Sequence, residues 1–191
     1  GSGIQSIISS AHLIRNEEAD LVLAGGMESM SQTPHVIRGL RVGLRLGEGK
    51  IEDSLTVALM DNHCGLMMAQ TADVLAREKG ITRKESDLFA LRSQRLANAA
   101  ADAGKLRDEI VPVEITKRGK TTVFDTVDHR RPDTTLEGLE KLAPVFGTDL
   151  VTAGNASGIV DGAAAVVVAG ADRARRDGLA CLGRVLGWHY E

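Results

Sequence analysis

The stretch TAGNASGIVDGAAAVVV, residues 152–168, joins a turn rich in Gly, Asn and Ser to a run of small apolar residues. Its triplet Ala156-Ser157-Gly158 exposes a backbone that a ligand could approach closely, because glycine carries no side chain. The continuous apolar run GAAAVVVAG at 162–170 predicts a buried strand. A plain turn at the entry to a strand has the same composition, since Asn and Gly are common in turns.

A second apolar run lies near the N-terminus. ADLVLAGGME, residues 19–28, predicts a buried parallel strand, and its Gly25-Gly26 pair indicates close backbone packing at the strand's end. Apolar residues at positions 4, 7, 8, 11 and 14 predict a helix before it. Beyond residue 170, ADRARRDG predicts a short surface helix, and LGRVLGWHY at 182–190 predicts a last strand. This order of elements is typical of an α/β fold.

The segment between the two apolar runs has a different pattern. Residues 28–62 are glycine-rich and irregular, so we expect a loop there. A first helix is predicted to end at Gly80. A second helix, over 82–104, is predicted to begin at Thr82, because Glu85 stands at the spacing of a capping box.

The later part of this segment contains a predicted hairpin and a further short helix. EIVPVEI and KTTVF, on either side of TKRG, predict a β-hairpin. HRRPDTTLEGLEKLAPVF, residues 129–146, predicts a proline-stiffened loop and then a short helix. We therefore expect an α/β core made of residues 1–27 and 151–191, with residues 28–150 inserted as a mostly helical domain.

Composition excludes several classes of protein. Hydrophobic residues make up 43% of the 191-residue chain and charged residues 26%, as in an ordinary globular domain. The formal net charge of −3 and the 3% aromatic content argue against a nucleic-acid partner. No apolar run approaches the length of a membrane span, and GSGIQSIISS lacks the features of a signal peptide. We expect a cytoplasmic protein without a membrane partner; a mitochondrial matrix or peroxisomal location is also compatible.

Neither a metal site nor a nucleotide cofactor is indicated by the spacing of the relevant residues. Cys64 and Cys181 are too few for a disulfide framework, and we expect both to be reduced. The histidines and cysteines show no ligand spacing typical of zinc. The glycines do not form the dinucleotide fingerprint, and the phosphate-binding loop ending in Gly-Lys-Ser/Thr is missing. We expect no metal and no cofactor.

Three other features have both a functional and an ordinary interpretation. The arginines at 38, 41 and 45 either grip phosphates or lie on a solvated loop or subunit contact, the second being more common. Met67-Met68 either packs in the core or lines a pocket for a flexible apolar chain. Arg130-Arg131-Pro132 would present a guanidinium with restricted freedom, because proline stiffens the residue before it.

Five motifs, taken together, closely resemble the thiolases, the family of acetyl-CoA acetyltransferase and 3-ketoacyl-CoA thiolase. They are GSGIQSI, AGGMESMSQTPH, DEIVPVEI, RPDTTLEGLEKLAPVF and TAGNASGIVDGAAAVVV, and they occur in family order over nearly the whole chain. The resemblance implies part of the N-terminal half of a thiolase-like fold, with a loop domain that covers coenzyme A (CoA). It also implies acyl transfer between CoA thioesters through an enzyme cysteine, a role in fatty acid metabolism, CoA as substrate, and a homo-oligomer, either dimer or tetramer.

The resemblance also implies where the reacting groups lie. The family's nucleophilic cysteine would precede Gly1, because Gly1-Ser2-Gly3 match the residues that follow it. The family's general base, in a Gly-His-Pro motif, and its acid, a second cysteine, belong to a C-terminal half that would lie beyond Glu191. We therefore assign no catalytic residue to this chain and expect it to be inactive by itself. The alternative is a noncatalytic CoA-binding or assembly module.

Four residues would contact the substrate by this resemblance. Arg131 matches the residue that packs against the adenine of CoA, and Ser157 matches one that touches the pantetheine arm, with Ala153 beside it. Asn155 is expected to satisfy the backbone of the turn. Met67 stands where many members of the family have a histidine that shapes the acyl pocket, which suggests a 3-oxoacyl chain longer than acetoacetyl.

Overall fold

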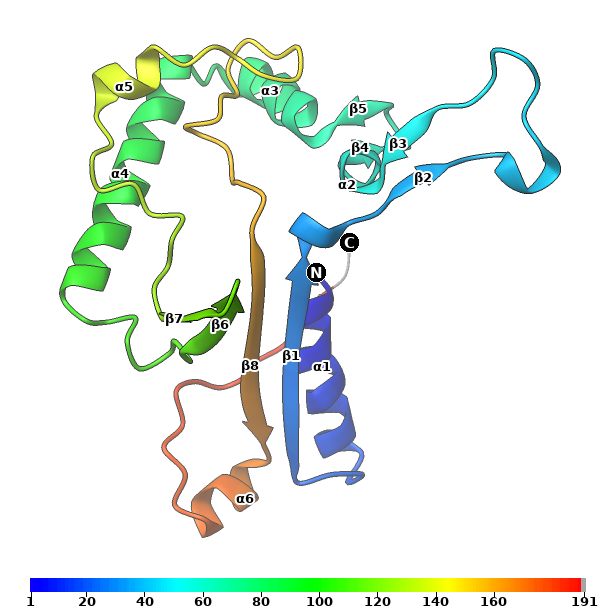
Figure 1. The fold of residues 1–191 in the computed structure, drawn as a ribbon. Coiled ribbons are helices and arrows are strands. Elements are labelled where there is room, and N and C mark those ends of the chain that lie inside the picture. The colour runs from blue at the N-terminus through cyan, green and yellow to red at the C-terminus, as the bar shows by residue number, and fades with distance from the viewer. Residues whose placement is uncertain (190–191) are drawn as a thin grey trace. The chain divides into compact units, whose positions relative to one another are not determined.

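The computed structural model describes residues 1–189 and divides the chain into two compact units (Figure 1). The first, here called the sheet unit, combines Gly1–Thr33 with the residues from Val160 onward. The second, the helical unit, is Pro34–Ile159. The boundaries predicted from the sequence lay at 27/28 and 150/151, and the assignment of 28–150 as a domain that covers CoA stays a prediction.

Helix α1 (Ser2–Arg15) packs against strand β1 (Leu21–Ser29) in the sheet unit. The hydroxyl of Ser6 donates a hydrogen bond to the carbonyl oxygen of Gly25 at 2.9 Å. Helix and strand lie so close at Gly26 that an added Cβ would be 3.2 Å from a backbone atom of α1. The predicted helix and the predicted close packing at the glycine pair are therefore confirmed.

Strand β8 (Asp161–Ala169) pairs with β1 in the antiparallel direction, with Leu21 opposite Ala169. The predicted parallel direction of the first strand is therefore wrong, and so is the predicted burial of both strands, because β8 has no buried residue and β1 has one, Ala24. Leu23, for example, is 74% exposed. An apolar run indicates that a strand forms, but its direction depends on how the intervening chain returns to the sheet. Its burial depends on what covers the sheet.

The region after β8 contains helix α6 (Ala171–Arg176), which confirms the predicted short helix. The strand predicted over 182–190 is wrong for residues 182–189, which form no strand, and Tyr190 lies outside the described residues. A strand needs a neighbour for its backbone N–H and C=O groups. Within residues 1–189 no strand pairs with this segment.

The segment predicted as a loop over 28–62 contains short regular elements. In chain order they are the end of β1, η1 (Met30–Gln32), β2 (His35–Ile37), η2 (Leu40–Val42), β3 (Ile51–Asp53), α2 (Ser54–Ala58) and β4 (Met60–Asp61). Strands β2 and β3 pair as an antiparallel hairpin, so the loop prediction is wrong there. Each strand has three residues, too few for an alternating pattern to be visible in the sequence.

Two long helices dominate the helical unit, α3 (Met68–Lys79) and α4 (Arg83–Asp102). Gly80 ends α3 in the left-handed conformation, with φ of 67°. At the start of α4 the Thr82 hydroxyl accepts from the amide of Glu85 at 3.2 Å, and the Glu85 carboxylate accepts from the amide of Thr82 at 2.7 Å. The predicted helix ends are confirmed. No described helix has the length and apolar character needed to cross a membrane.

The remaining elements are a hairpin and a one-turn helix. Strands β6 (Val113–Lys117) and β7 (Lys120–Phe124) pair in the antiparallel direction, as predicted. Their two-residue turn, Arg118-Gly119, has positive φ at both positions, which matches the twist of the strands. Helix α5 (Leu136–Glu140) follows, again as predicted. Strand β5 (Leu66–Met67) pairs with β4 just before α3.

Candidate functional site

All four residues predicted to contact the substrate lie in the helical unit. Ala153 and Ser157 are exposed in the turn of residues 152–158, here called the small-residue turn. Arg131 is exposed in the connection between β7 and α5, here called the arginine loop. Met67 is half-buried in β5.

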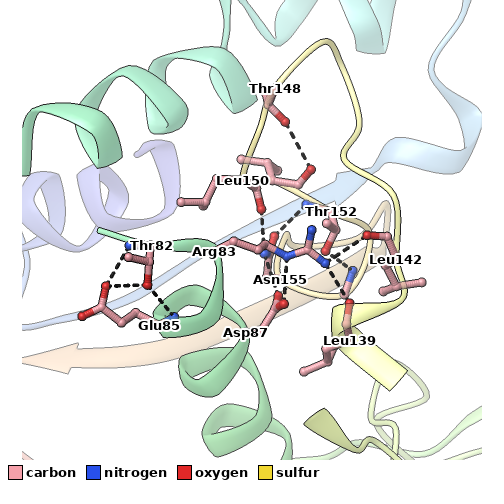
Figure 2. A network of polar contacts seen from close by, with 12 residues as sticks. Thr82, Arg83, Glu85, Asp87, Leu139, Leu142, Thr148, Leu150, Thr152 and Asn155 are labelled. Atoms are coloured by element: carbon pink, nitrogen blue, oxygen red, sulfur yellow. Dashed lines mark hydrogen bonds and ion pairs between the residues drawn. The ribbon is translucent and has the colours of Figure 1, made fainter. Parts of the chain in front are cut away.

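Asn155 holds the small-residue turn in shape through both ends of its side-chain amide. Its Oδ1 accepts from the amide of Thr152 at 2.8 Å, and its Nδ2 donates to the carbonyl oxygen of Leu150 at 3.0 Å. Nδ2 also donates to Oδ1 of Asp87 at 3.0 Å, as Figure 2 shows. The prediction that Asn155 satisfies the backbone of this turn is confirmed.

Asp87 of α4 is the acceptor beneath the turn and is fully buried. Its second oxygen accepts from Nε of Arg83 at 2.8 Å, one helical turn earlier. Nη2 of Arg83 donates in turn to the carbonyl oxygens of Leu139 and Leu142, at 2.8 and 3.0 Å (Figure 2). A buried carboxylate is tolerated when it is paired and hydrogen-bonded, and here both oxygens have partners.

Sequence reasoning missed Arg83 and Asp87, although a signal was present. The two residues stand at i and i+4 near the start of a capped helix, which is the spacing of a helical ion pair. Leu91, a further four residues along, is buried, so Asp87 lies on the apolar face of α4. A charged residue on the buried face of a helix is uncommon and indicates a specific partner.

Two glycines of the small-residue turn pack closely against neighbouring side chains. A Cβ at Gly154 would lie 2.5 Å from Cδ2 of Leu139 and 2.6 Å from Cδ1 of Leu142. A Cβ at Gly158 would overlap the imidazole ring of His129. The turn therefore packs against its neighbours with its backbone, while the side chain of Ser157, beside Gly158, stays exposed.

The arginine loop is attached to α4 through its main chain. The amide of Arg131 donates to Oε1 of Gln94 at 2.8 Å, and its carbonyl oxygen accepts from Nδ2 of Asn98 at 3.4 Å. Nη1 of the neighbouring Arg130 donates to Oδ1 of Asn98 at 3.0 Å. These contacts fix the backbone at Arg131 and leave its side chain exposed.

His129 brings the arginine loop and the small-residue turn together. It precedes Arg131 by two residues, and its ring occupies the space beside Gly158, the residue after Ser157. Two segments separated by more than twenty residues in the sequence therefore meet at this point. Sequence reasoning did not identify His129 as a contact between them.

Met67 is attached to a different part of the helical unit. Its amide donates to Oε1 of Gln70 at 2.9 Å, and Nε2 of Gln70 donates to the carbonyl oxygen of Phe146 at 3.2 Å. These contacts tie the start of α3 to the bend at 146–147. They do not join Met67 to Arg131 or to Ser157.

A cavity of about 340 Å³ lies beside the arginine loop, at the C-terminal end of α4. Arg107, Asp125 and Arg130 line it, and Nε of Arg130 is buried without a hydrogen-bond partner among the described residues. None of the four predicted contact residues lines this cavity. Two guanidinium groups and one carboxylate line this cavity, so the charge of the lining alone does not select an anionic ligand.

The other candidate chemistries find no support. Nε of Arg38 donates to Glu52 at 2.6 Å in an exposed ion pair, which favours the surface interpretation of these arginines. No group of three metal-ligating residues occurs within residues 1–189. Cys64 and Cys181 are free and exposed.

Comparison with known proteins establishes the family. The profile of the thiolase N-terminal domain matches residues 1–172, and the chain belongs to this family. The expected resemblance and the thiolase-like fold class are therefore confirmed. A human mitochondrial 3-ketoacyl-CoA thiolase is 49% identical over 191 residues, which cover 98% of this chain and 48% of the relative. An acetyl-CoA acetyltransferase of Pseudomonas aeruginosa is 44% identical, with 98% and 49% covered.

Solved structures agree with the sequence comparison. The crystal structure of human mitochondrial 3-ketoacyl-CoA thiolase is similar with a TM-score of 0.87 and 48% identity, over 93% of this chain and 46% of that one. The structure of the same human enzyme in complex with CoA has a TM-score of 0.86, over 93% and 45%. The chain spans about half the length of the curated relatives it matches.

Proposed function

We propose that this chain supplies a CoA-binding surface of an acyl-CoA acyltransferase of the thiolase class. CoA and its thioesters are the ligands, with the guanidinium of Arg131 packed on the adenine and the pantetheine arm lying along Ala153 and Ser157. The similarity to a thiolase solved in complex with CoA supports this assignment. Because CoA is a substrate here, the proposal needs no cofactor.

The contact between His129 and Gly158 is the observation that carries the proposal. It places the arginine loop against the small-residue turn within one unit, so that one extended ligand can touch both. A planar guanidinium packs well on an aromatic ring, and a turn of small residues lets a thin chain approach the backbone.

The acyl transfer itself is proposed to use a cysteine nucleophile that is neither Cys64 nor Cys181. In such a step a thiolate attacks the carbonyl carbon of the thioester, the bond between that carbon and the CoA sulfur breaks, and the CoA thiolate leaves and takes up a proton. The acyl group then passes from the enzyme sulfur to an acceptor carbon, and cleavage of a 3-oxoacyl-CoA is the reverse of this sequence. We expect the 191-residue chain alone to show no CoA-dependent cleavage of acetoacetyl-CoA or of longer 3-oxoacyl-CoA. Turnover that is lost when Cys64 or Cys181 is alkylated would overturn this assignment.

The second candidate is a noncatalytic CoA-binding or assembly module. Cys64 and Cys181 are both exposed, and neither forms a hydrogen bond with a histidine that could activate it as a nucleophile. This favours the noncatalytic module if the chain acts alone. The two candidates share the CoA site. They differ in whether the complete reading frame encodes a cysteine codon directly before Gly1 and a Gly-His-Pro segment downstream.

Isothermal titration calorimetry with CoA tests the binding site. Arg131→Ala and Ser157→Ala should each weaken CoA binding about fivefold, the equivalent of about 1 kcal/mol for an exposed ring contact or a hydrogen bond. Arg95→Ala and Ser93→Ala are matched controls, because both residues are exposed on α4. Unchanged affinity in both site variants would remove the proposal.

Three finer proposals follow from the same family assignment. The replacement of the family histidine by Met67 favours a 3-oxoacyl chain longer than acetoacetyl, so Met67→His should improve the affinity for acetoacetyl-CoA relative to a longer 3-oxoacyl-CoA.

A homo-oligomer is supported by exposed apolar strand residues such as Leu23 and Met27, and sedimentation velocity tests it. A cytoplasmic or mitochondrial location remains a proposal that imaging of a tagged protein would test.

A further inference from the structure

Helix α4 carries four polar side chains along one face. Arg83, Asp87, Gln94 and Asn98 are separated by four, seven and four residues, so they lie in one row along the helix. Leu91, between Asp87 and Gln94, is buried, whereas Ser93 and Arg95 on another face are exposed. We call the four polar residues the α4 row.

The two ends of the α4 row hold different segments. At the N-terminal end Asp87 accepts from Asn155 of the small-residue turn at 3.0 Å. At the C-terminal end Gln94 and Asn98 hold the amide and the carbonyl oxygen of Arg131, at 2.8 and 3.4 Å. One helix therefore contacts both segments, the arginine loop at its main chain and the small-residue turn through the side chain of Asn155.

We infer that the α4 row sets the spacing between the adenine contact and the pantetheine contact of CoA, with Asp87, Gln94 and Asn98 as positioning residues. The inference rests on the proposed function, since it concerns the same ligand. Seven residues of α-helix separate Asp87 from Gln94, which is a rise of about 10 Å. A helix keeps this distance constant, whereas two loops alone would not.

The physical benefit of such an arrangement is that the site is ordered before the ligand binds. A flexible loop loses conformational entropy when it closes on a ligand, and that loss weakens binding. Gln94 and Asn98 hold the backbone of the arginine loop, so the loop would lose less freedom on binding CoA. The row acts through Arg131 and Ser157 and has no contact of its own with the proposed ligand.

Ligands that contain only one part of CoA test the two ends of the α4 row separately. Gln94→Ala should weaken binding of CoA and of adenosine 3′,5′-bisphosphate about three- to tenfold and leave binding of pantetheine unchanged. Asn155→Ala should weaken binding of CoA and of pantetheine and leave binding of adenosine 3′,5′-bisphosphate unchanged. Because Asn155→Ala also removes hydrogen bonds within the protein, its ligand binding is measured at a temperature at which circular dichroism shows the variant to be folded. Ser93→Ala is the neutral control on the exposed face.

A double-mutant cycle distinguishes positioning from a general loss of stability. If Gln94 acts through Arg131, Gln94→Ala should have no further effect on CoA affinity in an Arg131→Ala background. An equal loss of affinity for all three ligands in Gln94→Ala, or full additivity with Arg131→Ala, would overturn the inference. No change of CoA affinity in Arg131→Ala itself would instead overturn the proposed adenine contact, so the two failures are distinguishable.

Discussion

The carboxylate of Asp87 and the side-chain amide of Asn155, 68 residues apart in the sequence, form a hydrogen bond of 3.0 Å in the interior of the helical unit. The same carboxylate pairs with Arg83, whose guanidinium also holds the carbonyl oxygens of Leu139 and Leu142. Asp87 and Arg83 together thus join α4 to the small-residue turn and to the C-terminal end of α5 (Figure 2).

Removal of the Asp87 carboxylate should strongly destabilise the protein. Asp87→Ala leaves the Arg83 guanidinium and the amide of Asn155 without their buried acceptor, and we expect a loss of about 3 kcal/mol in the free energy of unfolding. Urea unfolding followed by circular dichroism measures it. Glu78→Ala, an exposed carboxylate on α3, should change stability by less than about 0.5 kcal/mol. Equal effects of the two substitutions would contradict the role of the buried network.

A methyl group at Gly158 should displace the imidazole of His129. In Gly158→Ala the exposed imidazole of His129 must move to make room for the alanine Cβ, and we expect a loss of about 1 kcal/mol in the free energy of unfolding. In a His129→Ala background the same substitution should have little effect. Thermal unfolding of the four proteins of this cycle provides the measurement. A penalty that persists without the imidazole would show that the arginine loop and the small-residue turn do not meet as described.

The capping box of α4 should make part of the protein's stability dependent on acidity. Hydrogen bonds from the backbone amide and the hydroxyl of Thr82 lower the pKa of Glu85 from its usual 4.5. A carboxyl whose pKa is lower in the folded state stabilises that state above the unfolded pKa, and this contribution is lost as the pH falls through the folded value. The wild type should therefore be more stable than Glu85→Gln near neutral pH.

The difference in melting temperature between the wild type and Glu85→Gln should shrink as the pH is lowered from about 7 to about 3. Glu78→Gln serves as the control, since Glu78 is exposed on α3 and the difference from the wild type should vary little over the same range. A Glu85→Gln difference that stays constant below pH 4.5, or grows, would be incompatible with the capping geometry.

Asp161 should order the chain at the end of β1. Its carboxylate accepts from the hydroxyl of Ser31 and, at 2.9 Å, from the amide of Ser31, and these hydrogen bonds lower the pKa of Asp161. In Asp161→Ala the amide of Ser31 loses its acceptor and should exchange with deuterium faster than in the wild type. Asp172→Ala, an exposed carboxylate of α6, should leave that exchange rate unchanged. Equal exchange at Ser31 in all three proteins would contradict this contact.

Local signals in the sequence predicted α1, α3, α4, α5 and α6, the end of α3, the start of α4 and the β6–β7 hairpin. The helical periodicity before residue 15, the Thr82–Glu85 pair and Gly80 each act within a few residues, so a short window contains the whole signal. The family assignment was also available, because five motifs in order need no coordinates.

Tertiary structure alone decided how these elements meet. Neither the antiparallel pairing of β1 with β8 nor the hydrogen bond between Asp87 and Asn155 has a local signal, since the partners are separated by long stretches of chain. The same is true of Gln94 and Asn98, which hold the backbone of Arg131. Composition and periodicity describe what a segment can form by itself, whereas a long-range contact depends on the path of all the chain between its partners.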